Sequence, residues 1–478
     1  MDVDNSGAPG AANRRAADAA VALSQFALVL LTVLDLAAPA AWTVALLALA
    51  AAVFIGLEWR RAPLSIRRTS TLLAAAALVL LLFVPDAQAA LERGLRIGGL
   101  IGSLLLSIAT LSRAAQRMAL LRRVMGSVLE VPAERRFGTV TVASQFFGGF
   151  LGLAGITMMM EAASQAPLDS PREKVDCFGA IARGYAAANL WSPMFSNLSI
   201  LLAVNAGLAW NRVFPAALCL AAGNVVLALL LQRLGAWRAR SSGGAQAQPL
   251  GLQVPGDGWW TLLRGAWPVL LGMGCFLVVV LALSHWSRQP VAAVVIVLAP
   301  VVAWCLALAG PSARRPGHAT RQLLADFLGF RSLVGEVMLF FASGCAGTVI
   351  ASAIPPAWTA PLAAALTPYP VLACLFLAAG VVLLSCTSVH PMLSGIVLAT
   401  AFPAASLGLT PVAHVLALLA GLGMAVIMTP FSVLSLMSSR FSGMPLLTVS
   451  VRANVGFAAL NLLLVALVLG KASAFLPH

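Results

Sequence analysis

Residues 369–402 read YPVLACLFLAAGVVLLSCTSVHPMLSGIVLATAF, a long apolar run with polar residues and a proline in its middle. An apolar run of about 20 residues is long enough to cross a bilayer as a helix. A proline inside such a helix removes one backbone hydrogen bond and disrupts another, so the helix unwinds locally. This stretch therefore predicts a broken transmembrane helix over 369–402, with its break at Thr387, Ser388, His390 and Pro391.

The composition extends this interpretation to the whole chain. Hydrophobic residues make up 60% of it and charged residues 10%, and the mean hydropathy is +0.95. A soluble protein of this size carries about 25% charged residues. Only helices and closed barrels satisfy every backbone group in hydrocarbon, and continuous apolar runs favour helices. The predicted fold class is an all-α polytopic membrane protein with no sizeable soluble module.

The net charge of +14 is explained by topology. The arginines lie in short loops between apolar runs, as the positive-inside rule expects, so we expect a lipid bilayer and no nucleic acid as a partner. Lysine occurs only at Lys174 and Lys471, whereas arginine and alanine abound, which is typical of a GC-rich bacterial genome. The predicted location is the bacterial inner membrane, with a cytoplasmic N-terminal tail at 1–19.

A Gly-, Ser- and Gln-rich segment at 233–264 divides the chain. It carries Arg233, Arg238, Arg240 and Arg264, and it predicts a cytoplasmic linker. The first transmembrane half then covers 20–232 and the second covers 265–478.

Counting the crossings in the first half predicts a re-entrant hairpin at 139–175. If residues 139–160 crossed the membrane fully, the linker would lie outside, against its charge. A hairpin that enters and leaves on the cytoplasmic side removes the conflict. Four glycines loosen the segment, and Ser144 and Gln145 are polar at membrane depth. Irregular backbone at that depth is tolerated when it is buried in protein or lines a cavity.

The proline motif has a second copy about 198 residues earlier in the chain. Ser192-Pro193-Met194-Phe195-Ser196 matches His390-Pro391-Met392-Leu393-Ser394, which predicts a broken helix over 178–206. At the same offset, Gly149 falls on Gly347. Interrupted segments at corresponding positions in two halves are the best sequence indication of a transporter site. A kinked helix repacked by its neighbours is the alternative.

Together these segments predict one binding site near the bilayer midplane. Its candidate residues are the polar and helix-breaking residues of the hairpins and breaks, namely Ser144, Gln145, Ser192, Pro193, Ser196, Asn197, Ser343, Gly344, Thr387, Ser388, His390, Pro391 and Ser394. His390 is an ionisable group well inside a predicted span, where such groups are functional candidates.

Three further ionisable residues have simpler predicted roles. Arg183, one turn into its span, either extends to the interface or serves an anionic substrate. His285 and His414 flank loops, so we expect both to be solvated.

The order of these segments resembles the ion-transporter superfamily, which includes sodium-coupled dicarboxylate and citrate symporters and arsenite exporters. The shared pattern is a basic interfacial helix, a re-entrant hairpin and a broken helix, repeated once over about residues 96–431. The Ser-Asn-Thr hairpin-tip motif of the dicarboxylate members is absent. The resemblance implies two inverted repeats, and inversion requires that 333–353 crosses fully while 355–370 forms the second hairpin. The other arrangement places the second hairpin at 333–353.

The predicted function is secondary active transport of a small organic anion, a carboxylate, coupled to Na⁺ or H⁺. Half-helices that begin at Pro193 and Pro391 would direct positive dipole ends toward an anion. No nucleotide or zinc motif occurs, the seven cysteines lack metal-ligand spacing, and we expect no cofactor and no enzymatic activity. The alternatives are a lipid-modifying membrane enzyme and an inorganic oxyanion exporter of the same fold; a homodimer is one open assembly state.

Overall fold

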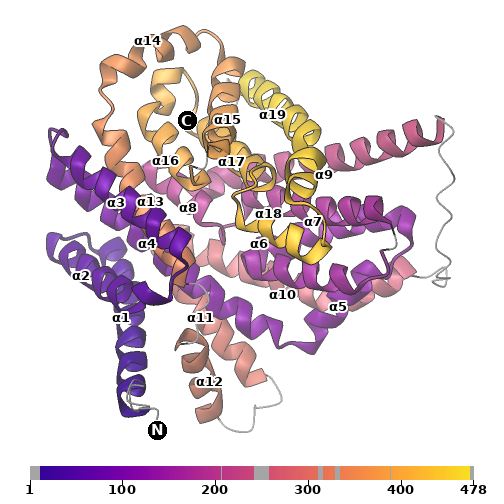
Figure 1. Cartoon of the computed structure of the whole chain (residues 1–478), viewed down its shortest axis with the longest axis horizontal. Coiled ribbons are helices and arrows are strands. Elements are labelled where there is room, and N and C mark those ends of the chain that lie inside the picture. Colours follow the sequence, from indigo (N-terminus) through magenta and orange to yellow (C-terminus); the bar gives the residue numbers. More distant parts are fainter. Residues whose placement is uncertain are drawn as a thin grey trace, which may run out of the picture.

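The computed structural model describes residues 11–168, 170–205, 207–241, 258–309, 316–328, 334–387 and 389–473, and every element in these ranges is helical (Figure 1). Within them, 12 helical segments are long and apolar enough to cross a membrane. The predicted all-α polytopic membrane class is therefore confirmed. The α-helices are α1 (Ala11–Ala37), α2 (Ala41–Glu58), α3 (Leu64–Leu81), α4 (Ala87–Gln116), α5 (Ala119–Leu129), α6 (Ala133–Gln165), α7 (Pro171–Trp191), α8 (Ser196–Val204), α9 (Trp210–Ser241), α10 (Gly258–Ser287), α11 (Val291–Ala309), α12 (Pro316–Leu328), α13 (Val334–Ala353), α14 (Pro356–Leu366), α15 (Pro370–Cys386), α16 (Pro391–Ala401), α17 (Pro411–Met428), α18 (Val433–Ser442) and α19 (Ala453–Ala472).

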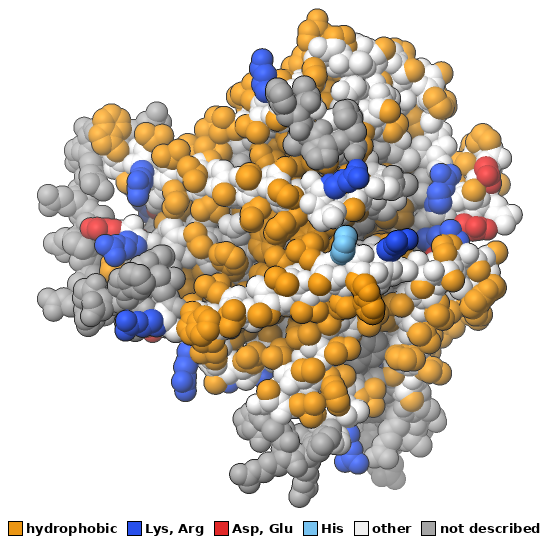
Figure 2. Space-filling view, turned by 180° about the vertical axis from the view of Figure 1, so that it is seen from behind, with side chains coloured by type: hydrophobic (Ala, Val, Ile, Leu, Met, Phe, Trp, Pro, Cys, Tyr) orange, Lys and Arg blue, Asp and Glu red, His pale blue; other side chains and the backbone are white. Residues whose placement is uncertain are grey.

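The molecule presents hydrophobic side chains over most of one face, with charged groups as isolated spots (Figure 2). Helices α3 and α10 bury only 6% of their most apolar windows, and large side chains such as Leu82 and Val278 point outward. A soluble protein rarely exposes an apolar surface of this extent, whereas lipid covers it at no cost.

Several helix starts follow local sequence rules. The side chains of Asp86, Ser170 and Thr410 each accept a hydrogen bond from the backbone N–H three residues later. Prolines at Pro171 and Pro411 occupy the first helical position, where no N–H is needed. These caps fix the starts of α4, α7 and α17, and therefore the depth of the helices that carry the predicted site.

The backbone of α6 reverses direction at Gly152. This residue has φ 58° and ψ −142°, a conformation open essentially to glycine alone. A Cβ atom on Gly155 would lie 2.4 Å from the carbonyl oxygen of Phe147, although residues eight apart in an unbroken helix are separated by about 12 Å. Ser112 of α4 donates a hydrogen bond of 2.9 Å to the carbonyl oxygen of Leu151, beside the turn. Residues 153–165 thus fold back on residues 133–151.

Both proline motifs interrupt helices. In the first half, α7 ends at Trp191 and α8 begins at Ser196; in the second half, α15 ends at Cys386 and α16 begins at Pro391. The prediction that a half-helix begins at Pro193 is wrong, because Phe195 N–H donates to the Ser192 carbonyl at 3.2 Å and so closes a turn before α8. The prediction for Pro391 agrees with the structure.

Helix α17 forms the centre of the core, and 89% of its most apolar window is buried. A Cβ on Gly421 would lie 2.5 Å from the carbonyl oxygen of Ala378 in α15, and a Cβ on Gly423 would lie 3.0 Å from that of Ala186 in α7. The two interrupted helices therefore pack on α17 at backbone contact.

His414, predicted to be solvated, is fully buried in α17, where its Nε2 pairs with the Phe402 carbonyl oxygen at 2.9 Å. That carbonyl lies at the end of α16, which explains why the histidine faces inward.

The region of the second predicted hairpin contains two separate helices. Residues 334–353 form one continuous helix, α13, which packs against α3, α4 and α16. Residues 356–366 form α14, a single short helix at the top of Figure 1 with mostly exposed side chains. Within the described residues, neither range folds back on itself as α6 does.

The predicted linker 233–264 contains the end of α9 and the start of α10; its residues 242–257 lie outside the described residues.

Candidate functional site

The first break is held by hydrogen bonds that connect it to the α6 hairpin. The Ser192 hydroxyl donates to the carbonyl oxygen of Gly149, close to the hairpin turn, and accepts from Met194 N–H at 3.1 Å. Trp210 donates its indole N–H to the Trp191 carbonyl at 3.2 Å. The carbonyls freed at the end of α7 are therefore partly satisfied by the protein, as buried backbone groups require.

Asn189 spans the first break with both ends of its carboxamide. Its Oδ1 accepts from Asn197 Nδ2 at 2.8 Å, and its Nδ2 donates to the Leu419 carbonyl of α17 at 3.0 Å. The side chain is 2% exposed. One residue thus connects α7, α8 and α17. We did not predict Asn189 as a site residue, although a buried amide directly before a proline motif was a usable signal.

The second break is centred on His390. Its backbone carbonyl accepts from Ser394 N–H at 3.2 Å, which places the histidine at the N-terminus of α16. Its ring packs edge-on against Phe340 of α13, with 4.7 Å between centroids. Thr387 is exposed and bonds back to the Leu384 carbonyl, so it does not join this cluster. Ser388 lies outside the described residues.

The two half-helices that follow the breaks lie against each other. Ile200 of α8 forms one apolar cluster with Met392 and Ile396 of α16, and Ile101 of α4 completes it. Both interrupted helices also pack on α17. We call the region between Asn189–Asn197 and Ser385–Ser394 the break site. The apolar contact between α8 and α16 brings the ends of the two motifs near each other, and their joint role as one binding site stays a prediction.

Several polar atoms around the break site are buried and have no hydrogen-bond partner among the described residues. They are Ser144 Oγ, Trp191 Nε1, Ser343 Oγ, His390 Nδ1 and Ser394 Oγ. Burying a polar group without a partner costs about 1–3 kcal/mol, so most buried polar atoms are paired. Other buried polar atoms without a partner occur elsewhere in the described residues, such as those of Asn224 and Asn461, so only the three that belong to the two breaks, those of Trp191, His390 and Ser394, are counted here as groups that a polar ligand could reach.

The remaining predicted residues contribute to helix packing around the break site. Gln145 lies where α6 meets Gly184 of α7, and Ser196 begins α8. Pro193 is buried in the first break, and Pro391 starts α16. Gly344 faces α4, where a Cβ would lie 2.7 Å from Ile101 Cδ1, so it contributes close helix packing and no polar group.

A carboxylate and a phenol add to the site from opposite halves of the chain. Glu336 of α13 lies one helical turn before Phe340, whose ring contacts His390. The Tyr185 ring packs on Phe195 at 4.9 Å. The chain contains only two tyrosines, and one of them lies deep inside a span, which was a signal we did not use.

The position of Arg183 along its helix differs from the predicted one. It lies in the middle of α7, because that helix begins at Pro171, well before the predicted start. Its guanidinium donates to the Ala453 carbonyl at 2.8 Å and to Asn454 Oδ1, and it stacks over the Phe457 ring at 4.8 Å. The arginine is thus held by α19 and is not free to extend to the interface.

Comparison with known proteins identifies the fold. No family model matches the chain, and no curated protein matches its sequence. The crystal structure of the YdaH transporter of Alcanivorax borkumensis, described as having an unusual topology, is similar over 80% of this chain and 86% of that one, with 17% sequence identity and a TM-score of 0.52. At this identity the likeness shows a shared fold alone.

Proposed function

We propose that the protein is a secondary active transporter that moves a small organic anion, a carboxylate, across the bacterial inner membrane by alternating access around the break site. One observation carries the proposal: two interrupted helices meet on α17, and buried polar atoms of both breaks have no hydrogen-bond partner among the described residues. The fold shared with a transporter supports it. Interrupted helices near mid-membrane are the usual location of transporter substrate sites.

The helix geometry favours an anionic substrate. Helices α8 and α16 begin inside the break site, at Ser196 and Pro391, and their first N–H groups have no partner within the helix. A helix start carries a positive dipole end, which attracts anions. His390, at the start of α16, adds a hydrogen-bond donor, and no residue of either break is acidic.

The coupling ion is proposed to be Na⁺ or H⁺. Glu336 supplies a carboxylate beside the break site, and His390 supplies a second group able to carry a proton. Symport requires that ion and substrate each favour binding of the other. A carboxylate next to an anion site meets this requirement, because neutralising it with a cation removes its repulsion of the substrate.

Flux measurements in proteoliposomes test the function. We expect an inward Na⁺ or pH gradient to drive accumulation of a labelled carboxylate, while organic cations are not carried. Replacing Ser196→Leu and His390→Ala together removes two donors to a charged group, each contributing about 1.5–3 kcal/mol, so the substrate KM should rise at least about tenfold.

The outcomes of this flux experiment separate the alternatives. Transport of arsenite or sulfate without any carboxylate would support the oxyanion exporter. Turnover of a lipid substrate without flux would support the membrane enzyme. Indifference to both gradients would remove the symport claim.

We further propose that the folded-back α6 is a re-entrant hairpin and that the two halves are inverted repeats, with the N-terminus in the cytoplasm. The reversal at Gly152 supports the hairpin, because it returns the chain toward the side from which α6 starts. Helix α13 is long enough to cross the membrane, as inversion requires, whereas α14 is a single helix and does not form the second hairpin that was predicted with it. A homodimer remains a compatible assembly.

Cysteine labelling in a variant without the seven native cysteines tests the hairpin. Glu130 precedes α6, Ser164 lies near its end, and both are exposed. Single cysteines at these two positions should react with a membrane-impermeant maleimide from the same side of inverted vesicles. Reaction from opposite sides would show that α6 crosses the membrane fully.

A further inference from the structure

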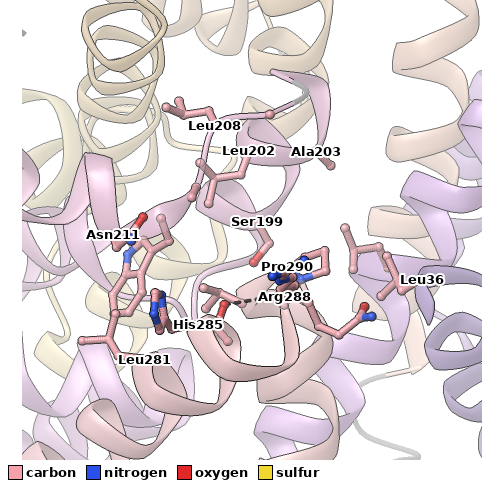
Figure 3. A pocket seen from close by; sticks show the side chains of 18 residues that line it. Leu36, Ser199, Leu202, Ala203, Leu208, Asn211, Leu281, His285, Arg288 and Pro290 are labelled. Carbon is pink, nitrogen blue, oxygen red and sulfur yellow. Dashed lines mark hydrogen bonds between the residues drawn. The ribbon is translucent and has the colours of Figure 1, made fainter. Parts of the chain in front are cut away.

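A cavity of about 430 Å³ lies apart from the break-site polar cluster, where four elements end (Figure 3). It is bordered by the end of α1, the α8–α9 connection, the α10–α11 turn and α4. Its volume is within the range of small-molecule sites, about 300–1,000 Å³.

The walls of this cavity are mostly apolar. Leu36, Leu100, Leu202, Leu208 and Leu281 line it, and the Trp210 ring adds an aromatic surface. Ligand sites combine such walls with a few polar groups that orient the ligand. A ligand that fills this cavity therefore needs a compact apolar body.

The polar groups in the cavity include one cation and several side chains that can donate hydrogen bonds. Arg288, His285, Asn211 and Gln289 line it, and Ser199 of α8 faces it from above Arg288 in Figure 3. Among the described residues, no acidic side chain lines the cavity. In the part of the chain that the structure describes, Arg288 has no carboxylate partner.

The carboxylate beside the lining is already engaged. Asp35 precedes the lining residue Leu36, but it pairs with Arg96 at 3.1 Å and accepts from Thr43 at 2.6 Å. The net charge of the side chains that line the cavity is therefore positive, and this charge favours an anionic ligand.

Arg288 is held in the cavity by a strained turn. It has φ 57°, a left-handed conformation that costs an L-residue roughly 1–2 kcal/mol. Ser284 Oγ donates to the Gln289 carbonyl at 2.8 Å, and Gln289 N–H donates to Ser287 Oγ at 3.3 Å. Strained residues of this kind persist where the surroundings over-determine them, and they concentrate at ligand-binding positions.

The cavity lies at the membrane face opposite to the arginine-rich linker. Trp210 begins α9 and Arg233 lies near its end, about 35 Å further along the helix axis. Arg264 and Ser287 are separated by a similar length of α10. The cavity therefore opens at one end of these two helices, and the proposed cytoplasmic arginines lie at the other.

We infer that this cavity is a second binding site, which takes a carboxylate with a compact apolar body and passes it to or from the break site along α8. The inference rests on the proposed function in taking the transported anion as its ligand. Ser199 lines the cavity and lies one turn after Ser196, so a single half-helix connects the two sites.

Protection of a cysteine label tests binding at this site without measuring transport. Ala209 lines the cavity and is exposed, so Ala209→Cys in the Cys-free full-length protein reports occupancy. In proteoliposomes, cyclohexanecarboxylate should slow maleimide labelling at least fivefold, whereas the neutral cyclohexanecarboxamide and acetate should not. Equal protection by carboxylate and carboxamide would overturn the inference, because it would show an apolar pocket without charge selection.

Two further variants separate this site from the break site. Arg288→Gln should abolish the protection, and Arg93→Gln, the same charge change at an exposed arginine outside the lining, should leave it intact. His390→Ala should also leave it intact. If His390→Ala removes the protection and Arg288→Gln does not, the anion acts only at the break site and the inference fails. Protection without any carboxylate flux would refute the proposed function and leave the second site standing.

Discussion

Replacing Gly184 by alanine is expected to abolish transport. A Cβ at this position would lie 2.2 Å from the Thr141 carbonyl oxygen and 2.8 Å from Ser144 Cβ, both in the first arm of the α6 hairpin. Backbone atoms cannot rotate away, so the arm must move by roughly an ångström. Overpacking of this kind costs about 1–3 kcal/mol and sometimes more. Because Ser192 bonds to Gly149 in the same arm, the displacement reaches the first break.

The matched control is Gly179→Ala in the same helix. Gly179 is buried, yet a Cβ there would meet no atom within 4 Å. We expect Gly184→Ala to lower the flux at least 100-fold and to reduce the thermal unfolding midpoint in detergent, while Gly179→Ala keeps both near wild type. Equal behaviour of the two variants would show that α6 and α7 separate freely, contrary to the packing described.

The second large effect is expected at Asn189. Asn189→Leu preserves the size of the side chain but removes its bonds to Asn197 and to the Leu419 carbonyl. Losing the amide leaves a buried partner unsatisfied at about 1–3 kcal/mol, in addition to about 1 kcal/mol for each lost bond. The first break then loses its side-chain hydrogen bond to α17, while the packing of α7 on α17 remains, and we expect flux to fall about 100-fold.

Asn205→Leu is the control for Asn189, because Asn205 lies just after the end of α8 and bonds locally to the Leu201 carbonyl. Measured side by side, the Asn205 variant should retain most of its activity. A purely structural role for Asn189 predicts a lower yield of folded protein, whereas a role in the site predicts a folded protein with a raised KM. Size-exclusion profiles together with kinetics distinguish the two.

The sequence predicted the breaks because their cause is local. A proline inside an apolar run removes a backbone hydrogen bond, and at these two positions polar residues accompany it, so the interruptions before Ser196 and at His390 could be predicted from residue order. A proline alone does not decide the break, because Pro300 lies inside the continuous helix α11. The start of α8 was misplaced because the turn at Ser192 depends on its own hydrogen bonds. The hairpin was predicted from the count of crossings, with four clustered glycines permitting it; the structure places the change of direction at Gly152, and whether the segment is re-entrant stays a prediction.

Other features depend on contacts between distant segments. The bond from Asn189 to Leu419 joins residues far apart in the chain, and the ring contact between Phe340 and His390 joins α13 to the second break. The sequence of either segment alone contains no pattern that predicts these pairings. His414 was mispredicted for the same reason, since its partner Phe402 belongs to the preceding helix end.

The two glycines of α17 have a mechanical consequence. With Gly421 against the backbone of α15 and Gly423 against that of α7, neither interrupted helix has room to slide past the core helix, and a push on one is transmitted to the other. The three helices should consequently move as one rigid body. We expect relative movement to occur where helices meet through apolar side chains without hydrogen bonds. The contact of Ile101 in α4 with Ile200, Met392 and Ile396 is of this kind. We therefore expect α4 to stay in place while the three helices, together with the break site, move along this contact.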